Sequence, residues 1–139
     1  MASVKPDIRV GNLMSVDPVT IGPDAPVADA ESLLKAYRIS GLPVVDSEVT
    51  VGVISQTDIV IARSSELISG NWQRLKVRNI MTAPAVTVHL ETSLRRAARL
   101  MIDRHIHRLV VVDGEERAVG VITPLDLLPH LIDGDVVAA

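Results

Sequence analysis

The chain contains no cysteine and no phenylalanine, and it has one tryptophan and one tyrosine among its 139 residues. The lack of cysteine excludes disulfides, thiolate catalysis and zinc sites built on cysteine. Proteins that stack nucleic-acid bases need aromatic side chains, and this chain has almost none. The net charge of −3 points the same way. We therefore do not expect nucleic acid as a partner.

Long apolar runs are also missing. No window approaches the ~18 uninterrupted apolar residues that suggest a membrane-spanning helix. The N-terminus lacks the apolar segment of a signal peptide. We therefore expect no membrane association and a cytoplasmic protein. Hydrophobic residues make up 47% of the chain and are mostly aliphatic, which is typical of aliphatic strands packed against helices in an α/β (α+β) fold.

The most informative feature that is present is an internal repeat. Three blocks recur in the same order, the first two at an offset of 67 positions and the third at 68. The blocks are LMSVDPVTI with IMTAPAVTV, ISGLPVVD with IHRLVVVD, and VGVISQTDIV with VGVITPLDLL. The extra residue falls in GEERA, which we interpret as a turn. The repeat predicts two copies, at residues 7–64 and 76–135, joined by a linker at 65–75.

Each copy has the pattern β-α-β-β-α, and we expect the two copies to pack about a pseudo-twofold axis. A short β segment comes first, at 19–21 or 86–88, and two aliphatic strands follow the helix, at 42–45 and 51–54 or at 109–112 and 118–122. Apolar residues at helical spacing predict that first helix: Val27, Ala30, Leu33, Leu34 and Tyr37 in one copy; Leu94, Ala97, Ala98 and Met101 in the other. A second helix is expected to begin near Thr57 or at Pro124.

Two such units, each opening with Met-Ser/Thr and closing with G-V-I-S/T-x-x-D, resemble a pair of CBS (cystathionine-β-synthase) domains over residues 8–132. The resemblance implies a stand-alone Bateman-type module without enzymatic activity. Such a module would bind AMP, ADP, ATP or S-adenosylmethionine in clefts between the copies, without a cofactor, as a regulatory and energy-sensing protein. It would act as a homodimer on a regulated protein that the sequence does not name.

The S/T-x-x-D motif at the start of each second helix has two compatible interpretations. A capping box alone explains Ser55 with Asp58 and Thr123 with Asp126. A helix start also attracts phosphate, and a carboxylate can accept both hydroxyls of a ribose. The resemblance implies that Asp58 and Asp126 bind ribose, and that Ser55 and Thr123 face phosphate. The glycines just before each motif, at 52 and 120, indicate either close approach of a ligand or a strand bulge.

The resemblance also implies an adenine pocket lined by the first β segment and the facing strand of each copy. Its candidates are Val19, Thr20, Ile21, Leu42, Pro43, Val86, Thr87, Val88, Leu109 and Val110. β-branched residues such as Thr20 and Thr87 are explained equally by an ordinary strand position.

The stretch RHIHRLVVVD allows several interpretations. In a strand, His105 and His107 would point to one side and could hold a metal, but a site needs three or four ligands. HRLVVVD resembles a phrase in the γ subunit of AMP-activated protein kinase, which implies that His107 and Arg108 contact phosphate. Arg104 and His105 are explained by the end of a helix. The alternatives to a nucleotide sensor are a ligand-free interaction scaffold and a metal-dependent enzyme using His105 and His107.

Overall fold

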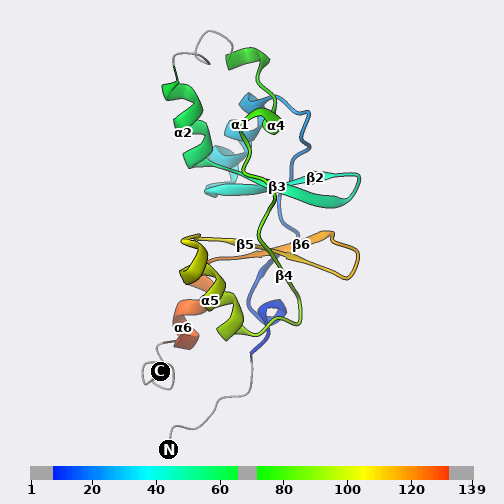
Figure 1. Ribbon diagram of the computed structural model, residues 1–139, viewed down its shortest axis with the longest axis vertical. Coiled ribbons are helices and arrows are strands. Elements are labelled where there is room, and N and C mark those ends of the chain that lie inside the picture. Colours follow the sequence, from blue (N-terminus) through cyan, green and yellow to red (C-terminus); the bar gives the residue numbers. More distant parts are fainter. Residues whose placement is uncertain (1–7, 66–71, 132–139) are drawn as a thin grey trace, which may run out of the picture. The chain divides into compact units, whose positions relative to one another are not determined.

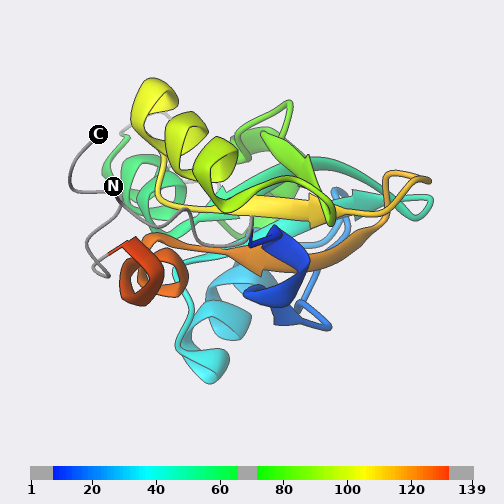
Figure 2. The same ribbon diagram turned by 90° about the horizontal axis from the view of Figure 1, so that it is seen from below.

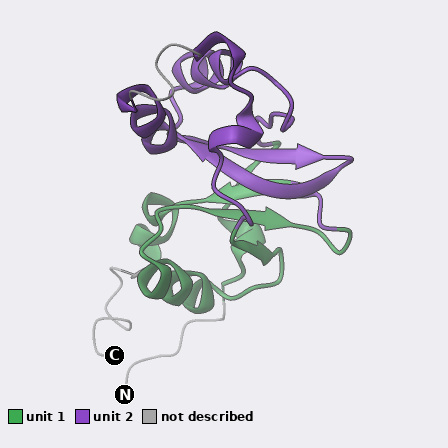
Figure 3. Cartoon of the chain, turned by 45° about the horizontal axis from the view of Figure 1, so that its top comes forward, with its two compact units in different colours: residues 1–17, 86–115, 119–139 green, residues 18–85, 116–118 purple. Residues whose placement is uncertain are grey.

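The computed structural model describes residues 8–65 and 72–131. The chain forms two compact units, coloured separately in Figure 3. Unit 1 contains the N-terminal segment up to Asp17, residues 86–115, and the chain from Val119 onward; unit 2 contains residues 18–85 and 116–118.

Unit 1 is built on a four-stranded sheet with the strand order β1-β6-β5-β4. The strands are β1 (Ser15–Val16), β4 (Thr87–His89), β5 (Leu109–Val112) and β6 (Ala118–Ile122). Helices α5 (Leu94–Arg104) and α6 (Pro124–Leu131) lie side by side and cover one face of the sheet (Figures 1 and 2). A 3-10 turn, η1 (Val10–Asn12), packs against the loop before α5, where the Val10 N–H donates to the Thr92 carbonyl at 2.8 Å.

Unit 2 repeats this arrangement with shorter outer strands. Its centre is an antiparallel hairpin of β2 (Gly41–Asp46) and β3 (Val49–Ser55), flanked by single bridges at Ile21 and Thr82. The helices α1 (Val27–Tyr37), α2 (Gln56–Ser64) and α4 (Val77–Ile80) pack on this hairpin, with a 3-10 turn, η2 (Trp72–Arg74), beside them. The bridges of Ile21 with Val44 and of Thr82 with Val53 occupy the positions that β4 and β1 hold in unit 1.

The boundaries of the compact units differ from those of the sequence repeats where each repeat begins. Residues 8–17 open the first sequence copy, but their strand β1 pairs with β6 of the second copy, inside unit 1. Reciprocally, Thr82 opens the second copy and pairs with Val53 inside unit 2. Each Met-Ser/Thr segment therefore completes the sheet of the other copy.

The aliphatic stripes form the cores that the helical spacing predicts, with one exception. Leu94, Ala97 and Met101 of α5 are buried, as are Val27, Ala30 and Leu34 of α1. Tyr37 was expected on the buried stripe of α1, and this expectation is wrong, because its side chain is 58% exposed. Tyr37 is the last residue of α1 and precedes Arg38, whose left-handed backbone ends the helix, so the stripe stops one turn earlier.

The expected strands and second helices are present, and the first β segments differ between the copies. β5 and β6 have the predicted bounds, and Pro124 is the first residue of α6. In the second copy the first β segment is the strand β4, whereas in the first copy only Ile21 forms a bridge and Val19 and Thr20 lie in a loop. Pro18, which precedes this segment, lacks the backbone N–H that a strand residue would donate to a neighbouring strand.

Candidate functional site

The start of α2 is a complete capping box formed by Ser55 and Asp58. The Ser55 hydroxyl accepts a hydrogen bond from the Asp58 backbone N–H at 3.2 Å, and Asp58 Oδ2 accepts one from the Ser55 backbone N–H at 2.9 Å. The Ser55 hydroxyl also donates to Oδ2 at 3.0 Å. These bonds fix the carboxylate of Asp58 beside the first turn of α2, where the helix dipole favours negative charge.

A second hydroxyl, from a distant part of the chain, contacts the other oxygen of Asp58. Thr82 Oγ1 donates to Asp58 Oδ1 at 3.1 Å. Thr82 reaches this position because its backbone is paired with Val53, with N–H to carbonyl distances of 2.9 and 2.8 Å. Thr82 was not predicted as a site residue. The signal that could have found it is the Met-Ser/Thr phrase, which recurs before each copy.

The start of α6 holds Asp126 in a similar way, except that the Asp126 N–H donates to the Thr123 carbonyl at 3.0 Å rather than to the Thr123 hydroxyl. Asp126 Oδ2 accepts hydrogen bonds from the Thr123 backbone N–H at 2.8 Å and from the Thr123 hydroxyl at 3.1 Å. Ser15 occupies the repeat position of Thr82 and pairs with Val121, but within residues 8–65 and 72–131 Ser15 makes no hydrogen bond to Asp126. The duplicated motif therefore yields two part-buried carboxylates with unequal surroundings.

The two glycines of the motif lie close to the backbone of the Met-Ser/Thr segments. A Cβ on Gly52 would lie 2.8 Å from the Thr82 carbonyl oxygen and 3.0 Å from Met81 Sδ. A Cβ on Gly120 would lie 2.8 Å from the Ser15 carbonyl oxygen and would also collide with Met14 Sδ. Each glycine thus leaves room for the Met-Ser/Thr segment, and this close packing places Thr82 near Asp58. β3 also carries a register shift beside Gly52, opposite Val44 and Val45.

The adenine-pocket candidates form two groups, one in each unit. In unit 2 the Ile21 N–H donates to the Pro43 carbonyl at 3.1 Å, and in unit 1 Thr87 is paired with Val110 across β4 and β5. The exposed or half-buried side chains are those of Val19, Thr20, Val86 and Thr87. The buried ones are those of Ile21, Leu42, Pro43, Val88, Leu109 and Val110. Of the buried side chains, those of Ile21, Leu42, Val88 and Leu109 belong to the hydrophobic cores of their units.

The stretch RHIHRL is not a strand, so the interpretation of His105 and His107 as a same-side pair in a strand does not apply. α5 ends at Arg104, and His105 is its C-cap with a left-handed backbone at φ 54°. The strand β5 begins only at Leu109. Arg104 and His105 therefore have the helix-ending position predicted for them.

His105 and His107 instead line an apolar hollow in unit 1. This hollow has a volume of about 520 Å³ and lies between α5, α6 and the loop that joins α5 to β5. Its remaining lining residues are Ala98, Met101, Ile102, Ile106, Pro124, Leu127 and Leu128. His107 is exposed and Arg108 half-buried. His107 thus shares a surface with Pro124, the residue after Thr123.

A metal centre on the histidines finds no support in the geometry. Among the described residues, no three His, Asp or Glu side chains lie close enough to hold one ion. The part of the chain that the structure covers also has no helix with both the length and the apolar character needed to cross a bilayer.

The fold and the duplicated helix-start carboxylates define a tandem module of two α/β units. The family model of the CBS domain matches residues 10–65 and 77–133. The chain belongs to the CBS domain family and carries the domain as a tandem pair.

Solved structures of similar chains are CBS pairs. The chain is 29% identical to CBSX2 of Arabidopsis thaliana, solved in complex with AMP, with a TM-score of 0.78 over 89% of this chain and 96% of that one. It is 28% identical to the CBS domain pair of protein MJ0100, solved with 5′-methylthioadenosine and S-adenosyl-L-methionine, with a TM-score of 0.78 over 91% and 97% of the two chains.

Curated relatives are longer than this chain. An uncharacterised protein of Methanocaldococcus jannaschii is 34% identical over 123 residues, which are 88% of this chain and 39% of that protein. The inosine-5′-monophosphate dehydrogenase of the same organism is also 34% identical, over 81% of this chain but only 21% of the enzyme. The chain thus spans between about a fifth and two fifths of the length of these two relatives.

Proposed function

We propose that the protein is a non-enzymatic regulatory module that binds an adenosyl ligand, of the AMP, ADP or ATP class or S-adenosylmethionine. The observation that carries the proposal is the duplicated helix start, at which Asp58 and Asp126 are each held by a capping-box bond of 2.9 or 2.8 Å from a backbone N–H. The complexes of similar pairs with AMP and with S-adenosyl-L-methionine support the ligand class.

Each helix start offers the groups that a nucleotide needs. An ionised carboxylate only accepts hydrogen bonds, so Asp58 and Asp126 suit the two donating hydroxyls of a ribose. The positive end of each helix dipole favours phosphate, with Ser55 and Thr123 beside it. In unit 1, Arg108 adds a guanidinium cation, and the imidazole of His107 lies in the same loop. We propose that these two residues contact phosphate in that unit.

The carboxylates would bind the ribose, and mostly backbone groups would contact the adenine base. The exposed Thr20 and half-buried Val19, Val86 and Thr87 are proposed to contact adenine, and the buried candidates to support the pocket wall. We propose that ligand binding regulates another domain or protein rather than a reaction at these carboxylates.

A calorimetric panel of AMP, ADP, ATP and S-adenosylmethionine tests the proposal. A ligand at about 100 times its dissociation constant should raise the free energy of unfolding by about 2.7 kcal/mol. The double variant Asp58→Asn with Asp126→Asn should lose that increase, whereas Asp29→Asn, on the exposed face of α1, should keep it. Absence of heat and of any melting shift with all four ligands at millimolar concentration would contradict the proposal.

The second candidate function is a ligand-free scaffold, and the apolar hollow of unit 1 favours an interaction role for this surface. Ile102 is 63% exposed and Leu128 47% exposed at its lining, which is unfavourable for an isolated surface in water. We propose that a second copy of the chain covers it, giving a homodimer. Light scattering should show a dimer for the natural chain and a monomer for Ile102→Glu. Val49→Glu, at an exposed apolar residue of unit 2, is the matched control and should stay dimeric.

These two tests separate the candidates. A dimer that binds none of the four ligands indicates the scaffold, and a chain that binds AMP whether or not Ile102 is substituted indicates a sensor whose binding does not require assembly.

A further inference from the structure

The carboxylates of Asp58 and Asp126 differ in how many of their oxygens are already engaged. Both oxygens of Asp58 accept hydrogen bonds, Oδ2 from Ser55 and Oδ1 from Thr82 at 3.1 Å. For Asp126, the bonds to Thr123 both end on Oδ2. Among the described residues, none donates a side-chain or backbone hydrogen bond to Asp126 Oδ1.

The difference comes from one repeat position, occupied by Thr82 in unit 2 and by Ser15 in unit 1. Both residues pair with the strand that precedes the motif, Thr82 with Val53 and Ser15 with Val121. Threonine has fewer favourable χ1 rotamers than serine because it is branched at Cβ, and the Thr82 hydroxyl points toward Asp58. Serine has no such restriction, and the hydroxyl of Ser15 makes no hydrogen bond to Asp126 in the part of the chain that the structure describes.

We propose that Thr82 is a specificity-determining residue that lowers the affinity of the Asp58 site for ribose-containing ligands and so makes the Asp126 site the tighter of the two. This inference rests on the proposed function of the two carboxylates. A ribose donates from two adjacent hydroxyls, and an ionised carboxylate receives them best when one oxygen is free of internal donors. At Asp126 such an oxygen exists. At Asp58 a ligand hydroxyl must displace Thr82 or share Oδ1 with it.

The experiment measures AMP binding at each site separately by isothermal titration calorimetry. Asp126→Asn leaves the Asp58 site, and Asp58→Asn leaves the Asp126 site. The Asp126→Asn protein should bind AMP more weakly than the Asp58→Asn protein. Adding Thr82→Val to Asp126→Asn removes the hydroxyl at nearly constant volume, and should strengthen AMP binding about two- to tenfold, the range expected for one hydrogen bond that no longer competes.

Two further variants guard the interpretation. Thr82→Ala lacks the same hydroxyl and should shift the affinity in the same direction if Thr82→Val disturbs folding. Ser15→Ala in the Asp58→Asn background is the matched control at the equivalent repeat position. Its AMP affinity should stay unchanged, because the Ser15 hydroxyl does not contact Asp126.

The outcomes distinguish this inference from the function on which it rests. If each Asp→Asn change removes one binding event, but loss of the Thr82 hydroxyl leaves AMP binding equal or weaker, the role of Thr82 is overturned and the nucleotide function stands. If AMP binds and neither Asp→Asn change affects it, or if AMP does not bind the natural chain, the carboxylate sites and the role of Thr82 are both overturned.

Discussion

The guanidinium carbon of Arg63 lies 4.0 Å from the centre of the Trp72 ring. The same guanidinium donates from Nη2 to Glu31 Oε1 at 3.0 Å and from Nε to Oε2 at 3.3 Å. Arg63 is on α2, Glu31 on α1, and Trp72 in η2. The Arg63 side chain therefore connects three elements of unit 2: α2, α1 and η2. In the sequence, η2 follows residues 66–71, which the structure does not describe.

Replacing Arg63 with methionine should lower the stability of the protein by about 1 kcal/mol. The change removes a cation–π contact of about 0.5–1 kcal/mol and an exposed ion pair worth about 0–1 kcal/mol. It keeps an unbranched apolar stem. Chemical denaturation followed by the fluorescence of Trp72, the single tryptophan of the chain, measures the effect.

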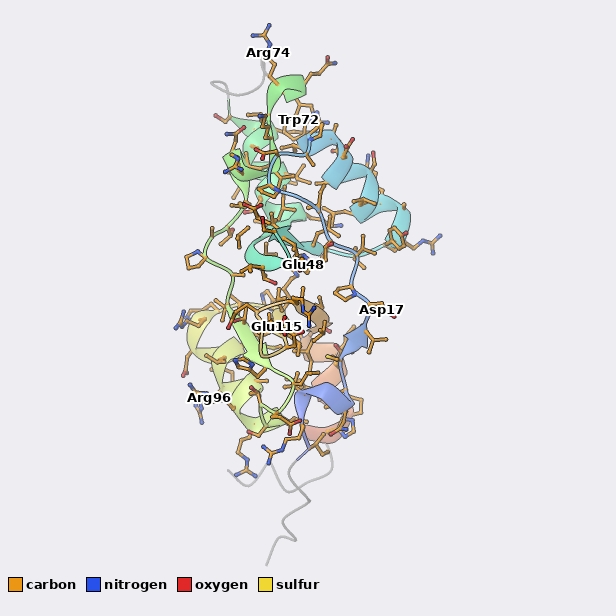
Figure 4. All side chains as sticks on the ribbon, turned by 90° about the vertical axis from the view of Figure 1, so that its right-hand side faces the viewer. Asp17, Glu48, Trp72, Arg74, Arg96 and Glu115 are labelled. Carbon is orange, nitrogen blue, oxygen red and sulfur yellow. The ribbon has the colours of Figure 1, made fainter. Side chains whose placement is uncertain are left out.

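Arg74→Met is the matched control for this prediction. Arg74 is also in η2, two residues from Trp72, and Figure 4 shows its side chain extending away from the ribbon. Its loss should change the stability by less than about 0.5 kcal/mol. Equal unfolding midpoints for the two variants would show that the contacts of Arg63 with Trp72 and Glu31 do not contribute to stability.

The ion pair of Glu31 should make part of this stability depend on pH. The hydrogen bond from Arg63 is the main cause that lowers the pKa of Glu31 below its ordinary value of 4.5. A carboxyl whose pKa is lower in the folded state stabilises the protein above its unfolded pKa and loses that contribution as the pH falls through the folded pKa. The stability advantage of the natural chain over Glu31→Gln should thus be complete above about pH 5.5 and shrink below pH 4.5.

Urea denaturation of both proteins between pH 3 and pH 7 measures this difference. A difference that stays constant over the whole range would show that Glu31 acts by packing rather than by charge. Asp24→Asn serves as a comparison, because the Arg78 hydrogen bond likewise lowers the pKa of Asp24 but Asp24 connects different elements.

Alanine at Gly52 or Gly120 should destabilise the protein by about 1–3 kcal/mol, the range for overpacking. In both cases the nearest backbone atom to the new methyl group would be a carbonyl oxygen 2.8 Å away, on Thr82 or on Ser15. Backbone cannot rotate aside as a methionine side chain can, so the Met-Ser/Thr segment must move. Thermal unfolding of the single variants measures the cost.

Gly114→Ala is the control, because nothing lies within 4 Å of a Cβ at that turn glycine. It should be neutral or slightly stabilising, since alanine restricts the unfolded chain. Loss of ligand binding in Gly52→Ala without loss of stability would indicate instead that the glycine serves the ligand.

The helices and strands could be predicted from the sequence because each depends on the spacing of apolar residues within a short segment. Helical spacing located α1 and α5, and the aliphatic runs located β5 and β6. The S/T-x-x-D motif predicted two capping boxes, and the one at Ser55 and Asp58 is complete. At Thr123 and Asp126 the bond from the Thr123 N–H to Asp126 Oδ2 is formed, but the Asp126 N–H donates to the Thr123 carbonyl instead of the hydroxyl. Membership of the CBS family followed from the repeat and is confirmed by the family match.

The features that the sequence did not reveal depend on pairing between distant segments. β1 has two residues, too few to show a period, so its partner β6 could not be inferred. Thr82 lies 24 positions from Asp58, and only the bridge to Val53 brings its hydroxyl there. The position of Arg104 and His105 at a helix end was predicted, but the left-handed backbone of His105 was not, because no distinctive residue type marks it.

The capping box at α2 should contribute to stability independently of any ligand, and this distinguishes its structural role from its proposed binding role. Ser55→Ala removes the hydroxyl that accepts from the Asp58 N–H at 3.2 Å, and such changes cost about 0.5–2 kcal/mol. Ser32→Ala is the control, since Ser32 is an exposed residue inside α1 where alanine is the better helix former. Denaturation without nucleotide should show a loss for Ser55→Ala and none for Ser32→Ala. If Ser55→Ala unfolds like the natural chain but weakens AMP binding, the hydroxyl is held for phosphate rather than for the helix, because a cap acts whether or not a ligand is present.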